Sequence, residues 1–219
     1  MKKMFIIIGV LAVIFIVMLI YKNTANGKSN ITIGEINKIE NYISKIYMWK
    51  EVTNESLPEF DNINNASDIW IWGVVKRNLE DYEVTYDQIE GQAKEIFGED
   101  FKKEFPKEGT QEIVYNQEND KYTLVETEFD ATEDDFLLNN IEKENDYYAI
   151  EIVEYLEDYS SDDLIIIRNT KEEEIAKVSN NDTELKIKEI VKEKIEKFTK
   201  KKVYLKQKEL TVEKVESIT

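Results

Sequence analysis

The chain of 219 residues carries 46 acidic and 29 basic side chains, which gives a formal net charge of −17 at neutral pH. It contains neither cysteine nor histidine, so disulfides, thiolate metal sites and nucleophilic sites of the Ser-His-Asp or Cys-His type are excluded. We expect no cofactor, and a metal ion would require oxygen ligands, as calcium does. The acidic surface repels nucleic acid, and no nucleic-acid partner is expected.

An uncharged apolar run, Met4–Tyr21, lies close to the N-terminus. As a helix, its eighteen residues would be about 27 Å long, which is close to the roughly 30 Å hydrocarbon core of a bilayer. The run is longer than the about 7–15 residues of a signal-peptide core, and the best cleavage position, after Ala25, has an unfavourable Asn23 before it. An uncleaved membrane anchor is therefore favoured over a cleaved signal peptide.

Lysines on both sides of the run set its predicted orientation. Lys2 and Lys3 favour a cytoplasmic N-terminus, which places the bulk of the chain outside the membrane. We predict a single-pass protein of the cell membrane, anchored through residues 4–21. Its predicted organisation is an anchor over residues 1–22, a linker over 23–30 and an extracytoplasmic domain over 31–219.

The first part of this domain is predicted to be helical. Apolar residues recur at spacings of three and four in an amphipathic first helix. The second is apolar on nearly all sides and begins at a capping residue, Ser67 or Asp68. The third starts with a capping box and ends at a glycine. These helices are Ile33–Trp49, Ser67–Leu79 and the segment from Thr85–Gln88 to Gly98.

Beyond Gly109 the apolar residues alternate with polar ones, as is typical of strands. We predict a hairpin, a strong amphipathic strand and a central strand, then one more helix and a final β-like segment. The stretch Ala131–Asp146 is predicted to be an acidic loop with a small apolar patch. In chain order the other elements are Glu112–Gln117, Lys121–Phe129, Tyr147–Tyr155, Leu164–Arg168, Glu184–Thr199 and Val203–Val215.

Helices that precede a mainly antiparallel strand series indicate an α+β fold with the helices packed on a curved sheet. The order helix-helix-helix-strand over Ile33–Leu164, with the helix exit at Gly98–Phe105, resembles the extracytoplasmic NTF2-like (cystatin-like) domains that bacteria place behind one N-terminal span. The helix Glu184–Thr199 departs from that pattern. The resemblance is architectural and implies no functional residue.

Two sets of residues are candidates for binding sites. Trp70, Trp72 and Tyr148 are candidates for an aromatic ligand pocket, and the alternative is that they fill the core. Three aspartates are candidates for calcium ligands, although their spacing departs from that of an EF-hand loop and acidic loops are commonly just solvated. These aspartates are Asp158, Asp162 and Asp163.

No set of residues forms a recognisable catalytic motif. The leading hypothesis is a non-enzymatic membrane protein whose outer domain assembles with or regulates other cell-envelope proteins, and it predicts an exposed apolar patch or sheet edge. The second is a module that binds a small ligand or peptide, which predicts an open pocket lined by tyrosine and tryptophan. The third is a hydrolase that uses carboxylates alone, which predicts two convergent buried acids.

Overall fold

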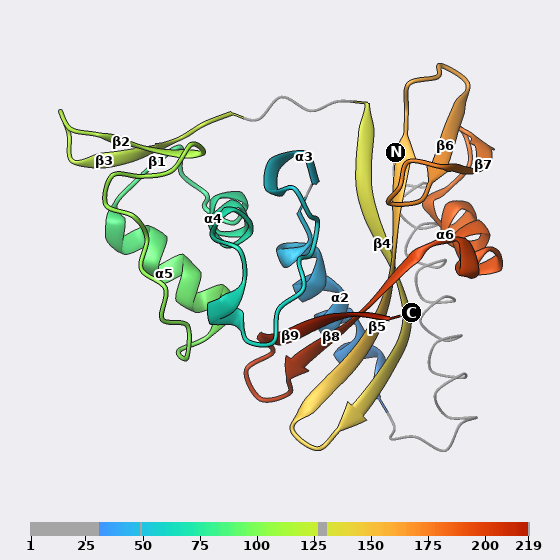
Figure 1. The fold of residues 1–219 in the computed structure, drawn as a ribbon, viewed down its shortest axis with the longest axis horizontal. Helices are drawn as coiled ribbons and strands as arrows, with labels where there is room; N and C mark the ends of the chain where they lie inside the picture. The colour runs from blue at the N-terminus through green and yellow to red at the C-terminus, as the bar shows by residue number, and fades with distance from the viewer. Residues whose placement is uncertain (1–30, 49, 127–130, 219) are drawn as a thin grey trace.

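The computed structural model describes residues 31–48, 50–126 and 131–218. They form an α+β fold in which helices pack on a curled antiparallel sheet (Figure 1), so this part of the predicted fold class is confirmed. No helix in the described ranges is long and apolar enough to cross a membrane. The predicted anchor at 4–21 and the linker at 23–30 lie outside these ranges, and both stay predictions.

The predicted helices of the first part are present. Two of them begin with a complete capping box, in which a threonine side chain and the side chain three residues on satisfy each other's backbone N–H groups. One of these two, the third predicted helix, ends at Gly98, whose φ of 89° is in the left-handed region that favours glycine. The helical elements are α2 (Ile33–Ile46), α3 (Lys50–Thr53), the 3₁₀ turn η1 (Ile63–Asn65), α4 (Asp68–Arg77) and α5 (Tyr86–Phe97).

A small antiparallel sheet lies beside α5, at one end of the long axis of the molecule (Figure 1). Its central strand is β3, which pairs with β1 on one side and β2 on the other. The predicted hairpin at 112–129 is thus confirmed over its described residues. The strands are β1 (Glu83–Val84), β2 (Ile113–Asn116) and β3 (Lys121–Leu124).

The main sheet has six strands and is built around β5. One edge of β5 pairs with β4 along its whole length. The other edge is shared, because β8 pairs with its first part and β6 with its last three residues. Outer strands β7 and β9 pair with β6 and β8. The strands are β4 (Thr132–Glu144), β5 (Tyr147–Asp158), β6 (Leu164–Arg168), β7 (Glu174–Ser179), β8 (Thr199–Lys206) and β9 (Val212–Ile218).

The prediction of an acidic loop at 131–146 was wrong, because this stretch contains the thirteen-residue strand β4. Three consecutive buried residues, Phe136 to Leu138, and a bulge between Leu138 and Asn140 break the alternation that would have indicated a strand. The strand forms because its backbone groups hydrogen-bond to β5 along its whole length, on both sides of the bulge.

The helix predicted at 184–199 is shorter in the structure. Helix α6 covers Glu184–Glu193, the 3₁₀ turn η2 covers Ile195–Lys197, and β8 already begins at Thr199. Of the predicted helix only Thr199 becomes strand, and the lysines directly after it, Lys200 to Lys202, belong to β8 and pair with β5 although lysine suits a helix by propensity. Strand β7 was not predicted at all, since Glu174–Ser179 is short and its apolar residues do not alternate regularly with polar ones.

The two faces of β5 belong to two different hydrophobic clusters. Tyr148, Ile150 and Ile152 face the large cluster formed with α2, α4 and α5. Val153 and Tyr155 point to the opposite face and pack in a smaller cluster with β6, β7 and α6. Helices therefore cover both faces of the main sheet, which follows from the period of two along a strand.

Candidate functional site

The outer face of the small sheet exposes apolar side chains. Val114 on β2 is 46% exposed, and Val125, which directly follows β3, is 38% exposed. Val125 donates its backbone N–H to Glu112, and Val114 pairs with Thr123, so the two valines are diagonal neighbours on one face. Tyr82, just before β1, is 59% exposed, but it lies opposite Leu124 and precedes the outward-facing Glu83, so it belongs to the edge of the other face. We call Val114 and Val125 the valine patch.

The inner face of the small sheet explains why the valine patch points outward. Ile113, Tyr122 and Leu124 are buried in the large cluster. The ring of Tyr122 lies 5.3 Å from that of Phe105 and 6.4 Å from that of Tyr86 on α5. Because successive residues of a strand point to opposite faces, burying Ile113 and Leu124 forces the adjacent Val114 and Val125 into solvent.

The sequence contains a signal for this patch. Ile113 and Val114 are consecutive apolar residues, as are Leu124 and Val125. A half-buried strand alternates apolar with polar residues, so an apolar pair in such a short strand indicates that one of the two faces solvent. Which of the two does so depends on the packing against α5.

The exposed edge of the main sheet is a second predicted type of interaction surface, but β4 does not offer it. Among the described residues, β4 pairs only with β5. Its outer side is obstructed, because the Tyr47 hydroxyl donates to the Asp135 carbonyl at 3.2 Å. Helices α2 and α6 lie on opposite faces of the main sheet. Around the β4 edge, the Lys188 ammonium of α6 lies 3.9 Å from the Glu40 carboxylate of α2. An added strand would have to break both contacts.

Two of the predicted ligand residues, Trp70 and Trp72, lie in the core. Both are at most 3% exposed. The indole N–H of Trp70 donates to the Ser56 carbonyl at 3.2 Å, and the ring of Trp72 packs edge-on against Phe105 at 5.1 Å. Trp70 is thus a core residue, because its ring is buried and its only polar atom is hydrogen-bonded inside the protein. The structure therefore does not bring the tryptophans to a pocket.

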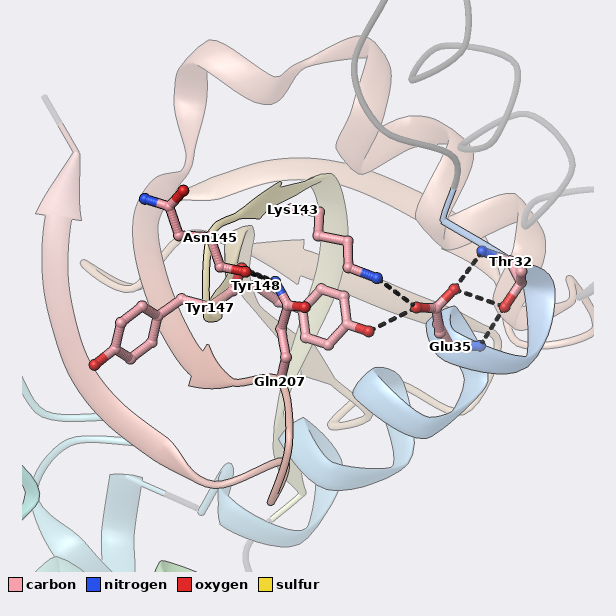
Figure 2. Close-up of polar contacts among 7 residues, drawn as sticks. All are labelled: Thr32, Glu35, Lys143, Asn145, Tyr147, Tyr148 and Gln207. Carbon is pink, nitrogen blue, oxygen red and sulfur yellow. Dashed lines mark hydrogen bonds and ion pairs between the residues drawn. The ribbon is translucent and has the colours of Figure 1, made fainter.

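The third predicted ligand residue, Tyr148, contributes to a cavity of about 550 Å³ between the β4–β5 and β8–β9 turns. Figure 2 shows its hydroxyl donating to Glu35 at 2.7 Å, where Lys143 also approaches at 3.2 Å. On the other side of this region, the Gln207 side chain donates to the carbonyls of Asn145 and Tyr147, each at 2.8 Å (Figure 2).

The contacts of Glu35 assign these residues a structural role. Hydrogen bonds from the Thr32 backbone, the Tyr148 hydroxyl and the Thr32 hydroxyl lower the pKa of Glu35 to about 2. This carboxylate thus closes the capping box of α2 and joins the helix to β4 and β5. The cavity is lined by three lysines and two acids together with the tyrosines, which is a more charged lining than ligand pockets ordinarily have.

The three candidate calcium ligands are not assembled into a site. One oxygen of Asp158 accepts from Arg168 at 2.9 Å, and the other accepts from the Ser160 backbone. Asp162 and Asp163 are exposed in the turn between β5 and β6. Within the described ranges, no group of three or more acidic side chains is placed to hold a metal ion.

Buried and half-buried carboxylates do occur on the main sheet, near the start of β4. Asp134 and Glu154 lie on the same face of adjacent strands, and burial raises the pKa of both. Asp134 accepts hydrogen bonds from the Lys50 backbone and the Ser56 hydroxyl. Glu154 is paired with the buried Lys201 at 3.5 Å.

These two acids fasten a loop rather than form a catalytic pair. Lys201 also donates to the Leu57 carbonyl, so both acids hold residues 50–57 against the sheet. Asp134 lines a cavity of about 730 Å³, but Glu154 does not. A carboxylate pair for hydrolysis needs both groups to face one substrate, and this arrangement does not favour the hydrolase hypothesis.

Comparison of the chain with protein-family models, with curated proteins and with solved structures found no match. The resemblance to NTF2-like domains therefore stays a prediction, and inference about function depends on the surfaces described above.

Proposed function

We propose that the chain is a non-enzymatic single-pass membrane protein, with a cytoplasmic N-terminus, whose extracytoplasmic domain binds another cell-envelope protein through the valine patch. The observation that carries the proposal is the exposure of Val114 and Val125 as neighbours on one face of the small sheet. Single exposed apolar residues are normal on soluble surfaces, whereas a group of them is typical of protein interaction sites.

The position of the small sheet supports this proposal. It lies at one end of the molecule, well separated from the N-terminal end of α2 in Figure 1. A domain tethered through the predicted anchor at 4–21 would hold its patch away from the tether, where a partner in the envelope can reach it. The apolar run itself motivates the membrane location.

Site-specific photo-cross-linking tests the proposal. A photoreactive phenylalanine analogue is placed at Val125 in the full chain, and native membranes are irradiated. Leu164 on β6 is the matched control, because both positions are 38% exposed. We expect a discrete cross-linked envelope protein from Val125, and its loss when Val114→Asp is added.

Cross-linking from Leu164 alone, or equally from both positions, would contradict the valine patch as the interface. Recovery of the chain in the soluble fraction of lysed cells would contradict the membrane location.

A further inference from the structure

Acidic side chains are concentrated in the segments that carry the valine patch. Residues 80–84 and 110–126, which form the small sheet and its flanks, contain seven acids and one lysine. Glu83 lies on the outer face in the same cross-strand row as Thr123 and Val114. The seven acids are Glu80, Asp81, Glu83, Glu112, Glu118, Asp120 and Glu126.

Part of this negative charge is compensated within the protein. Glu112 pairs with Lys76, and Glu83 is 3.9 Å from Lys121. The remainder is not, because Glu80, Asp81 and Glu126 are exposed and form no ion pair with any residue that the structure describes. We call these three residues the acidic rim.

The backbone of the small sheet is closed to an added strand along β2. Gly109 forms an isolated bridge with Val114 on the outer side of this strand. Gly109 has a φ of 84°, and a Cβ at this position would come within 2.5 Å of the Ile113 carbonyl oxygen. At the β2 edge, a partner therefore meets side chains of the sheet face and not a free row of backbone groups.

We propose that the partner of this surface is a protein segment that presents basic and apolar side chains together. This inference rests on the proposed function and names the chemistry of the partner. Apolar groups would cover Val114 and Val125, and lysine or arginine would neutralise the acidic rim. Opposite charges across an interface accelerate association and select the partner.

The same charges disfavour a second copy of this chain. Two copies meeting through the valine patch would bring two acidic rims within the about 8–10 Å over which charges interact at physiological salt. Like charges placed across an interface act against the wrong partner. A basic partner is thus favoured over self-association.

Two synthetic peptides test the proposal on the full chain in zwitterionic detergent. One alternates lysine and valine, and the other alternates glutamate and valine, over eight residues each. Fluorescence anisotropy is measured at low and at physiological salt. We expect the lysine peptide to bind, with weaker binding at higher salt, and the glutamate peptide not to bind.

Charge reversal locates the binding. The variant Glu80→Lys, Asp81→Lys, Glu126→Lys should weaken binding of the lysine peptide at least tenfold. The control variant reverses Asp162, Asp163 and Glu189, which are exposed acids of the β5–β6 turn and α6, and changes the net charge equally. It should retain most of the binding. Equal losses in the two variants would overturn the proposal.

The apolar half of the surface is tested separately. The double variant Val114→Ser, Val125→Ser keeps every charge and is expected to weaken peptide binding about fivefold, whereas Leu164→Ser should leave it unchanged. Unchanged binding in the double variant would overturn the apolar part of the proposal.

Failure of this inference can be told apart from failure of the proposed function. If Val125 cross-links a discrete envelope protein but the glutamate peptide binds as well as the lysine peptide, the function stands and the basic partner is refuted. If the lysine peptide binds through the acidic rim and no envelope protein is cross-linked, the proposed function is refuted instead.

Discussion

At the scale of the residue, the pKa of Glu157 depends on the packing around its carboxyl group. It lies directly opposite Glu133 in the β4–β5 ladder and is only 5% exposed. Burial, together with the charges of Asp135, Glu133 and Glu184, raises the pKa of Glu157 to about 7, although the Tyr159 hydroxyl donates to it. Below this pH the carboxyl group is protonated and neutral, so its burial beside other acids no longer costs the free energy of a buried charge.

This shift predicts a pH dependence of stability. A raised pKa means that the folded chain binds more protons than the unfolded chain between about pH 4.5 and 7, so stability falls as pH rises through this range. Glu157→Gln removes the effect. We expect the variant to be more stable than the wild type by about 3 kcal/mol at pH 8 and little changed at pH 4.

Urea unfolding of the two chains at both pH values checks this prediction. The exposed Glu193→Gln is the control and should change neither value. A difference between the Glu157 variant and the wild type that is the same at pH 4 and pH 8 would contradict the assigned titration.

At the scale of elements, the helices depend on local signals and the strands on their partners. The capping box of α5 contains hydrogen bonds from the Thr85 backbone to Gln88 at 2.8 Å and from the Gln88 backbone to Thr85 at 3.3 Å. Helix α4 has Ser67 at the same position, but its side chain makes no capping bond. Burial of Trp70 to Val75 on nearly all sides holds α4 instead.

The two caps can be compared by matched substitution. Thr85→Ala is expected to destabilise the protein by about 1 kcal/mol, because it leaves the Gln88 N–H without its partner. Ser67→Ala removes a serine at the same helical position without breaking a capping bond and should cost clearly less. Thermal unfolding of both variants measures the difference, and equal losses would show that the α5 capping box adds nothing to the helix.

At the scale of the whole molecule, the described residues build both hydrophobic clusters. The first residue that takes part is Ile31, which is 5% exposed, and Thr32 directly after it caps α2. We therefore expect residues from 31 onward to fold without the predicted anchor.

Truncation tests this independence. A chain that starts at Ser29 should be soluble and folded, with circular dichroism showing mixed helix and strand. A chain that starts at Gly34 loses Ile31 and the cap of α2, and we expect it to be less stable by about 2–4 kcal/mol. Aggregation of the chain that starts at Ser29 would indicate that the N-terminal segment belongs to the fold.

Strand β4 also determines where proteases are expected to cleave the chain. The strand pairs with β5 from Thr132 onward, so its backbone is protected from proteases, contrary to what a loop would allow. With the domain outside the cell, trypsin added to intact cells should cleave instead at exposed sites such as Lys171, in the turn before β7. Full protection of the chain would contradict the outside orientation.

The sequence by itself determined where the main helices begin, because a helix bonds within its own segment. The capping boxes at Thr32 and Thr85 and the glycine at position 98 act within one turn of each helix end. The strong strand at 147–155 was also readable, since Tyr148, Ile150 and Ile152 alternate with residues of the other face. The α+β class followed from the order of these elements.

Only the tertiary structure decided the remaining strands and the candidate site. Strand β4 and the lysines of β8 form strands because β5 lies between them, and no local pattern encodes a partner that is distant in the sequence. For the same reason the sequence left open whether Trp70 lines a pocket or fills the core, and which of Ile113 and Val114 faces solvent. Packing in the large cluster buries one residue of each apolar pair in the small sheet, and the valine patch is what this packing leaves exposed.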